Sequence, residues 1–156
     1  MFQDLNCGMC RQAYKTLLPL LEKEYISTGQ VSFEMREFPL GGRAKEVELA
    51  RMALCSGLQG KYWEFLDLHY NRTGTEAVPL PAVIEKLKLD RKAISSCLES
   101  DASKRAVFSD IDLGNKLGVV GTPFTYVNGK LVRGLQSIEQ YQEIIRQEIL
   151  VSRNKK

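Results

Sequence analysis

The sequence lacks most of what a metal site or a nucleic-acid surface needs. It has one histidine, His69, and its four cysteines include a single closely spaced pair, Cys7 and Cys10. The formal net charge is only +3, which gives no reason to expect nucleic acid as a partner. No apolar run approaches the roughly 18 residues of a membrane-spanning helix, and no signal peptide is evident. What remains is a chain of 156 residues, long enough for a globular domain with a hydrophobic core.

The cysteines suggest two different roles. Four cysteines in a chain of this length are too few for a disulfide scaffold. Cys7 and Cys10 form a CxxC motif, whereas Cys55 and Cys97 lie far apart in sequence. The close pair is therefore a candidate redox or metal site, and the distant pair needs a separate explanation.

Hydrophobic periodicity predicts a strand, a helix and a second strand in the first part of the chain. Residues 1–5 read as a strand, and apolar residues at helical spacing predict a helix from the cysteine motif to about Gly29. Residues 31–38 alternate between apolar and polar, as in a strand. This order is a βαβ unit and predicts two parallel strands.

The middle of the chain reads as helices in succession, and β character returns near the end. Residues 43–117 contain no convincing strand, and Asp90 is placed to cap one of the expected helices. Asn128-Gly129 between two short β runs predicts a hairpin. Ser137 with Gln140 predicts a capping box that begins a final helix.

This order of elements predicts an α/β thioredoxin fold with an inserted all-helical domain and a truncated N-terminal strand. We expect a discontinuous thioredoxin-like domain formed by residues 1–42 and 118–156. The helical insertion would then comprise residues 43–117.

The chemistry of a CxxC motif at the start of a helix favours redox exchange. Unpaired N–H groups and the helix dipole stabilise a thiolate at this position. The first sulfur is then the exposed nucleophile, and the second attacks the mixed disulfide. We therefore predict that Cys7 is the nucleophile and Cys10 the resolving thiol.

Three other interpretations of the pair stay open. A zinc site would need a second pair of ligands, which the sequence does not offer, so no metal is predicted. A copper(I)-binding module could use Met9 together with the two thiolates. A purely structural disulfide would close a ring too small to restrain much of the unfolded chain.

Several segments of the sequence resemble the DsbA-like thiol:disulfide oxidoreductases. The resemblance is carried by FQDLNCGMC, FPL, QGKYWEFLDLHY and GVVGTPFTYVNGKLVRG, and it runs over nearly the whole chain. It implies that Pro123 is a cis proline facing the cysteines and that Thr122 offers backbone groups to an extended substrate. Gly8 and Met9 would then belong to the substrate-binding surface. The chain departs from the family in the strand before the motif, which begins only at Met1, where many relatives carry an acid. It also has Gly8-Met9 in place of the Pro-His of the strongest oxidants, so a less extreme oxidant is expected.

The resemblance also implies an activity and its setting. The Cys7–Cys10 disulfide would be passed to reduced or misfolded substrate proteins, with no cofactor beyond that redox-active disulfide. A membrane redox partner would reoxidise the pair, and the protein would act as a monomer in the periplasm or elsewhere outside the cytoplasm. The alternatives are a reductase or isomerase of the same fold, or a cytoplasmic relative.

Residues outside the motif carry weaker expectations. Cys55 and Cys97 lie on two expected helices and form either a structural disulfide or two buried thiols. Helical spacing puts His69 or Tyr70 on the same apolar side of an expected helix as Phe65 and Leu66. His69 is expected to be a capping or surface residue rather than a catalytic one. Trp63 is expected to pack in the core or at a domain interface.

Overall fold

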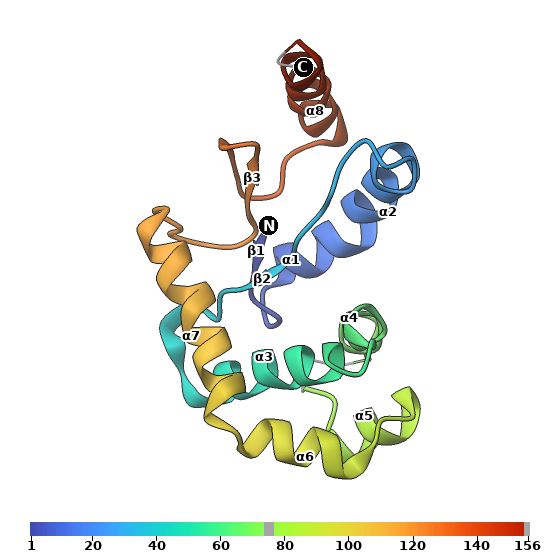
Figure 1. The fold of residues 1–156 in the computed structure, drawn as a ribbon, viewed down its shortest axis with the longest axis vertical. Coiled ribbons are helices and arrows are strands. Elements are labelled where there is room, and N and C mark those ends of the chain that lie inside the picture. Colours follow the sequence, from blue (N-terminus) through green and yellow to red (C-terminus); the bar gives the residue numbers. More distant parts are fainter. Residues whose placement is uncertain (74–76, 155–156) are drawn as a thin grey trace.

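The computed structural model describes residues 1–73 and 77–154, and its strands form one sheet in the order β2-β1-β3-β4. The strands are β1 (Phe2–Gln3), β2 (Arg36–Glu37), β3 (Phe124–Val127) and β4 (Lys130–Arg133). β1 pairs in parallel with β2 and antiparallel with β3, and β3 pairs antiparallel with β4. The predicted βαβ unit is therefore confirmed, and the chain adds the late hairpin to the other side of β1 (Figure 1).

The second strand is shorter than predicted. Val31, Phe33 and Met35 are partly buried while the residues between them are exposed, so the alternation in the sequence is real. Only Arg36 and Glu37 belong to β2, however. The Arg36 and Phe38 N–H groups donate to the carbonyls of Met1 and Gln3. A strand extends only as far as its neighbour supplies hydrogen-bond partners, and the short β1 limits the length of β2. The prediction of a strand over residues 31–38 was wrong for its first five residues.

The helix after the cysteine motif is continuous but not uniform. It runs through α1 (Gly8–Gln12), η1 (Ala13–Leu17), α2 (Leu18–Leu21) and η2 (Glu22–Ile26), of which η1 and η2 are π-helical. Pro19 explains the first wide turn, because proline has no N–H and its ring crowds the carbonyl four residues earlier. The predicted apolar stripe is nevertheless buried at Leu17, Leu21 and Tyr25.

Between the second and third strands, the described residues form a short 3-10 helix, η3 (Leu40–Gly42), and then five α-helices in succession, in agreement with the predicted run of helices. They are α3 (Ala44–Gly57), α4 (Tyr62–Tyr70), α5 (Leu80–Leu87), α6 (Arg91–Glu99) and α7 (Asp101–Lys116). Asp90 caps α6 by accepting a hydrogen bond from the Ala93 N–H at 2.7 Å. In Figure 1 the helices α3 to α6 gather in the lower half, away from α2 and α8. The division of the chain at residues 43 and 117 into two domains stays a prediction.

The core of the helical segment extends to the cysteine motif. Phe65, Leu66 and Tyr70 of α4 are fully buried in it, each contributing about 1.5–3 kcal/mol by transfer from water. Leu5 and Cys10 belong to the same apolar cluster. The residues that flank and include the CxxC motif are therefore held by packing against the helices 43–117.

The C-terminal elements form as predicted. Asn128 and Gly129 have positive φ angles of 48° and 88°, the conformation that a two-residue hairpin turn requires. Ser137 and Gln140 make a full capping box at the start of α8 (Ile138–Arg153). Tyr141 of α8 is buried and lies 3.0 Å from the Thr125 hydroxyl, which fixes this helix against β3.

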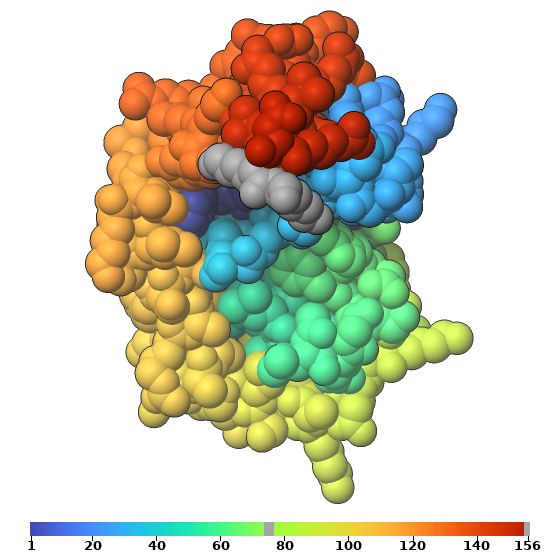
Figure 2. Space-filling model, turned by 45° about the horizontal axis from the view of Figure 1, so that its top comes forward, coloured from blue at the N-terminus to red at the C-terminus, as the bar shows by residue number. Residues whose placement is uncertain are grey.

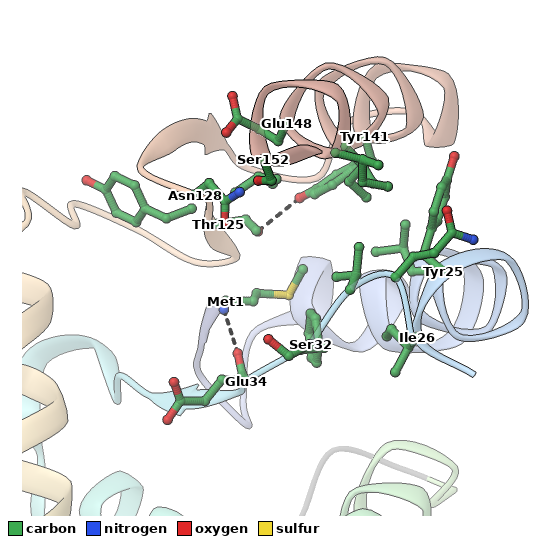
Figure 3. A pocket seen from close by; sticks show the side chains of 18 of the residues that line it. Met1, Tyr25, Ile26, Ser32, Glu34, Thr125, Asn128, Tyr141, Glu148 and Ser152 are labelled. Carbon is green, nitrogen blue, oxygen red and sulfur yellow. Dashed lines mark hydrogen bonds between the residues drawn. The ribbon is translucent and has the colours of Figure 1, made fainter. Parts of the chain in front are cut away.

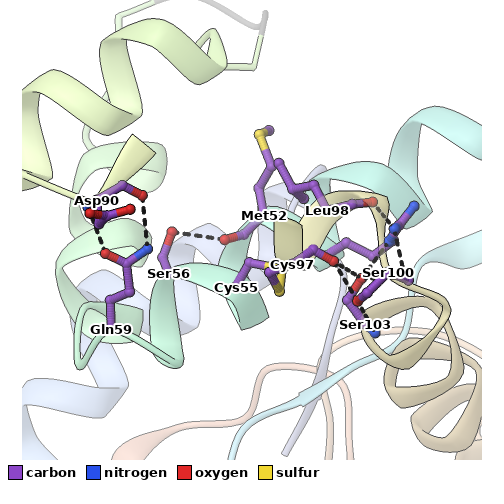
Figure 4. The surroundings of a disulfide bond; sticks show 10 residues. Met52, Cys55, Ser56, Gln59, Asp90, Cys97, Leu98, Ser100 and Ser103 are labelled. Atoms are coloured by element: carbon purple, nitrogen blue, oxygen red, sulfur yellow. Dashed lines mark hydrogen bonds between the residues drawn. A yellow bond between two sulfur atoms is a disulfide. The ribbon is translucent and has the colours of Figure 1, made fainter. Parts of the chain in front are cut away.

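Cys55 and Cys97 are joined by a disulfide, one of the two alternatives for this pair (Figure 4). The bond links α3 to α6, with a Cα–Cα distance of 5.8 Å. Arg51 reinforces the same junction, because its guanidinium donates to the carbonyls of Leu98 and Ser100 and to the Ser103 hydroxyl. The end of α6 is thus tied to α3 by one covalent bond and several hydrogen bonds.

Within residues 1–73 and 77–154, no helix has both the length and the apolar character needed to cross a bilayer.

Removing the second disulfide should destabilise the protein substantially. The two cysteines are 42 residues apart, so loop closure predicts a loss of about 4 kcal/mol in the free energy of unfolding for the double variant Cys55→Ala/Cys97→Ala. Urea unfolding followed by circular dichroism measures it. Cys7→Ala is the control, because it removes a thiol without removing this cross-link. A loss below about 1 kcal/mol would show that the bond contributes little in solution.

Candidate active site

Cys7 begins α1 and follows a tight turn. Its N–H donates to the Asp4 carbonyl at 3.0 Å, which closes residues Asp4–Cys7 into the turn. The residue is the N-cap of α1, and its sulfur accepts a hydrogen bond from the Cys10 N–H at 3.4 Å. The Cys7 sulfur therefore lies at the positive end of a helix, where N–H groups favour a thiolate.

The loop before β3 faces this sulfur. The Cys7 thiol donates to the Thr122 carbonyl at 3.2 Å, across a sequence separation of 115 residues. The Thr122–Pro123 peptide bond is cis, and the Pro123 side chain is fully buried. The Pro123 carbonyl accepts from the Gly134 N–H at 3.0 Å, so the hairpin holds the loop. Thus Cys7, Thr122 and Pro123, expected to form one site, do lie together.

Thr122 has two polar groups next to Cys7. Its carbonyl accepts the hydrogen bond only when Cys7 is a thiol, and the contact of its backbone groups with a substrate stays a prediction. Its hydroxyl oxygen is buried and has no hydrogen-bond partner among the described residues. Conversion of Cys7 from thiol to thiolate removes the donor to the carbonyl and creates an acceptor for the hydroxyl, so Thr122 can respond to the ionisation state of Cys7.

The two cysteines have opposite acidities. The Cys10 thiol, by hydrogen bonding to Cys7, lowers the pKa of Cys7 to about 5; burial opposes this, and the Thr122 side chain and the N–H groups of Cys10 and Met9 support it. The pKa of Cys10 is raised, first because its proton is held by Cys7 and then because it is buried. At neutral pH, Cys7 is therefore a thiolate and Cys10 a thiol.

Burial separates the two sulfurs in the same sense. Cys10 is only 2% exposed, whereas Cys7 is partly accessible. Met9, between them, is 47% exposed on α1, and Gly8 is exposed beside it. An incoming protein thiol or disulfide can thus reach Cys7 but not Cys10. The contact of Gly8 and Met9 with substrate stays a prediction.

Helix α4 approaches the motif from the helical segment, and one expectation for it was wrong. His69 is 1% exposed rather than at the surface, and its Nε2 lies 2.8 Å from the Leu5 carbonyl. Trp63 is 43% exposed, and its ring contacts Tyr62 and Phe33. Of the two places expected for it, the structure therefore favours the boundary between residues 1–42 and the helical segment over the core. The helical periodicity had put His69 or Tyr70 on the buried face, but its partner at Leu5 comes only from the tertiary structure.

A buried carboxyl group, which the sequence reasoning missed, lies on β2 next to β1. Glu37 is 1% exposed, and its Oε1 accepts from the Tyr62 hydroxyl at 2.6 Å and from Gln3 Nε2 at 3.1 Å. Its second oxygen, Oε2, is buried without a partner among the described residues. Burial raises the pKa of Glu37 to about 7, against the hydrogen bonds from Tyr62 and Gln3. The sequence offered one indication that Glu37 is buried: it lies between Arg36 and Phe38, at the end of the predicted strand 31–38.

The same network reaches the turn before Cys7. The Tyr70 hydroxyl donates to Gln3 Oε1 at 2.9 Å and lies 3.5 Å from the Asp4 carbonyl. Glu37, Tyr62, Gln3 and Tyr70 thus form a continuous buried hydrogen-bonded chain that ends beside the Asp4–Cys7 turn. No carboxyl group takes the position of Met1, but a titratable carboxyl is present on the neighbouring strand.

A cavity of about 660 Å³ lies away from the dithiol, between α8, the residues after η2 and the start of the chain. Figure 2 shows the surface hollowed beside the N-terminal residues, and Figure 3 shows Met1 and Ser32 on one side of the space and Thr125 and Tyr141 on the other. The Met1 amino group donates to the Glu34 carbonyl at 2.7 Å at its edge. Neither Cys7 nor Thr122 lines this cavity, so it is separate from the candidate active site.

Among residues 1–73 and 77–154, no group of three or more His, Cys, Asp or Glu side chains is placed to hold a metal ion.

Comparison with known proteins places this geometry in a family context. A family model described as thioredoxin matches residues 1–147. The probable disulfide bond formation protein D of Bacillus anthracis is 35% identical over 139 residues, which cover 83% of this chain and 64% of that protein. The disulfide bond formation protein D of Bacillus subtilis is 23% identical over 157 residues, covering 95% of the chain and 70% of the protein. The chain thus spans less than two thirds of the first of these relatives.

Solved structures show the same fold. A thioredoxin-like oxidoreductase from Silicibacter pomeroyi DSS-3 superimposes with a TM-score of 0.80 at 26% identity, over 94% of this chain and 83% of that one. The alpha-DsbA1 of Wolbachia pipientis gives a TM-score of 0.78 at 20% identity, over 97% of this chain and 86% of that one. The predicted thioredoxin-type α/β fold with added helices is therefore confirmed.

The acidity of Cys7 can be tested directly. The rate of alkylation by iodoacetamide should rise with pH through a midpoint near 5, because the thiolate is the reactive form and the pKa of Cys7 is lowered to about 5. In Cys10→Ala the midpoint should move upward, since the first cause of the low pKa is lost. A midpoint near the ordinary value of 9.0 in the unmodified protein would contradict the assignment.

The buried carboxyl should make stability depend on pH. The folded-state pKa of Glu37, about 7, lies above its ordinary value of 4.5, so its contribution is fully present below pH 4.5 and is lost as the pH rises through 7. Relative to Glu37→Gln, the wild type should therefore lose about 2 to 3 kcal/mol of unfolding free energy between pH 5 and pH 8. Urea unfolding of both proteins at several pH values measures this difference. Parallel curves would show that Glu37 does not titrate in this range.

Proposed function

Because the chain belongs to the thioredoxin family, we propose that it is a protein thiol:disulfide oxidoreductase that works through Cys7 and Cys10. One observation carries the proposal: an accessible sulfur of lowered pKa at a helix N-terminus, hydrogen-bonded to a buried partner thiol and facing a cis-proline loop. The names of the Bacillus relatives as disulfide bond formation proteins support the same activity.

In the proposed reaction the oxidised Cys7–Cys10 disulfide accepts two electrons from a substrate protein. A substrate thiolate attacks the Cys7 sulfur, a mixed disulfide forms, and Cys10 leaves and takes up a proton. A second substrate thiolate then attacks the substrate sulfur of the mixed disulfide. The substrate disulfide forms, and Cys7 departs as a thiolate.

The low pKa of Cys7 supports the oxidising direction. A thiol of low pKa is a good leaving group, and stabilising the reduced dithiol makes the disulfide a stronger oxidant. We therefore propose disulfide formation in exported proteins as the role. A reductase or isomerase of the same fold is the alternative, and a copper(I) module that uses Met9 is a more distant one.

The setting of the activity is part of the proposal. The Cys55–Cys97 disulfide favours an oxidising compartment, so we place the protein in the periplasm or elsewhere outside the cytoplasm. Reoxidation would require a membrane redox partner, and reduced or misfolded proteins would be the substrates. The protein would act as a monomer, without a cofactor other than its own disulfide.

Substitution of the two cysteines tests the mechanism. Cys7→Ser should reduce oxidation of a reduced, unfolded substrate protein to the uncatalysed rate, because no mixed disulfide can form. Cys10→Ala, mixed with a substrate protein that already contains a disulfide, should attack that disulfide through the Cys7 thiolate and release one substrate thiolate. The mixed disulfide should then accumulate and be visible on a non-reducing gel, because no Cys10 thiol resolves it. The double variant Cys55→Ala/Cys97→Ala, assayed well below its unfolding temperature, is the control. Full oxidase activity in Cys7→Ser would refute the proposal.

A redox titration in glutathione buffers would fix the direction. A potential near that of strong oxidases, about −120 mV, supports disulfide formation, whereas a value near −270 mV indicates a thioredoxin-like reductant.

A further inference from the structure

The turn Asp4–Cys7 is fixed by a hydrogen bond within it and by contacts with residues far away in sequence. Asp4 Oδ1 accepts from the Asn6 N–H at 2.7 Å, and Oδ2 accepts from the Leu40 N–H at 2.7 Å. These contacts leave the Leu5 carbonyl pointing toward α4, where it meets His69 Nε2 at 2.8 Å. The Leu5 carbonyl is two residues before Cys7. The hydrogen bond that holds this carbonyl therefore helps to fix the position of the Cys7 backbone.

His69 is suited to hold this carbonyl. A carbonyl can only accept a hydrogen bond, so Nε2 carries the proton and the ring is the Nε2–H tautomer. Burial lowers the pKa of His69 to about 4, which keeps the ring neutral at neutral pH. The ring is also stacked on Phe65, with the planes 6° apart. The donor is therefore fixed in direction and does not change with pH near neutrality.

The other ring nitrogen shows that His69 is not simply a core residue. Nδ1 is buried and has no hydrogen-bond partner among the described residues. Leaving a buried polar atom unpaired costs stability, and an apolar side chain would avoid that cost. The single hydrogen bond to Leu5 is what the histidine adds at this position.

Other contacts fix α4 to the helix on the far side of the motif. The Tyr14 hydroxyl donates to Asp67 Oδ1 at 2.9 Å, and Arg11 Nη2 donates to the Arg72 carbonyl at 2.9 Å. The end of α4 therefore contacts the chain both before Cys7 and after Cys10. It forms a rigid support for the CxxC motif, of which His69 is the part nearest to the turn.

We propose that His69 is a positioning residue for the dithiol: its Nε2–H holds the Leu5 carbonyl and so keeps the Cys7 sulfur in register with Thr122 and the Cys10 N–H. The inference rests on the proposed function, since it concerns the nucleophile of that reaction. It assigns a role in the redox site to a residue of the helical segment, which acts through the Leu5 carbonyl. Loss of the hydrogen bond should loosen the turn and weaken the interactions that stabilise the Cys7 thiolate.

Three variants of His69 separate positioning from packing. His69→Leu fills the space without a donor, His69→Gln places an amide N–H near the position of Nε2, and His69→Asn has an amide too short to reach Leu5. The readout is the pH dependence of Cys7 alkylation by iodoacetamide in the reduced protein, together with the reduction potential. We expect His69→Leu and His69→Asn to slow alkylation at pH 5 by about threefold to tenfold, and His69→Gln to stay within about twofold of the wild type.

Tyr141→Phe is the matched control, because it also removes one buried side-chain hydrogen bond, from α8 to Thr125. It should lower the unfolding midpoint but leave the alkylation profile unchanged. If His69→Leu does not fold, the Asn and Gln variants decide the question, since both keep a polar amide. The proposal is overturned if folded His69→Leu or His69→Asn keeps the wild-type profile, if His69→Gln does not restore it, or if Tyr141→Phe shifts it equally.

The outcome is independent of the test of function. Alkylation reports the reactivity of Cys7 with a small reagent and involves no protein substrate. If Cys7→Ser retained oxidase activity, the proposed function would fail whatever the His69 variants showed. If only the His69 variants behaved like the wild type, the function would stand and the positioning role would not.

Discussion

The contact between the Cys7 sulfur and the Thr122 carbonyl joins the segment that follows β1 to the segment that precedes β3. It joins residues 115 apart in sequence, and the paired strands β1 and β3 lie directly next to the segments that carry the two residues. β1 has two residues, so its pairing alone is weak. The helices from 44 to 116 compensate, because their apolar cluster includes Leu5 and Cys10 on either side of the nucleophile.

Sequence patterns predicted much of this architecture because they report local energetics. The caps at Asp90 and Ser137 and the turn at Asn128-Gly129 depend on residues within a few positions, and all three are present as predicted. The order of strands and helices followed from the change of period along the chain. The chemistry of a CxxC motif at a helix start indicated Cys7 and Cys10 as the redox pair, whereas Thr122 and Pro123 were indicated only by the resemblance to DsbA-like proteins.

What could not be predicted depends on partners distant in sequence. The alternation of apolar and polar residues over 31–38 identified the side chains that face the protein interior. The length of β1, however, decides how many of these residues pair with it as a strand. The helical spacing put His69 or Tyr70 on the buried face of α4, yet the carbonyl that His69 binds belongs to Leu5, 64 residues earlier. Glu37 was overlooked for the same reason: a charged residue in a strand appears exposed until Tyr62 and Gln3 are seen to enclose it.

The unequal burial of the two sulfurs has a consequence for the identity of reaction intermediates. Both sulfurs of a disulfide are electrophilic. A thiolate that attacks an unshielded CxxC disulfide can therefore form a mixed disulfide with either cysteine. Here the accessible atom is Cys7, while Cys10 lies within the apolar cluster that also contains Phe65 and Leu66. A protein substrate can therefore form a mixed disulfide only with Cys7. Every covalent complex on the way to product carries the substrate on the Cys7 sulfur.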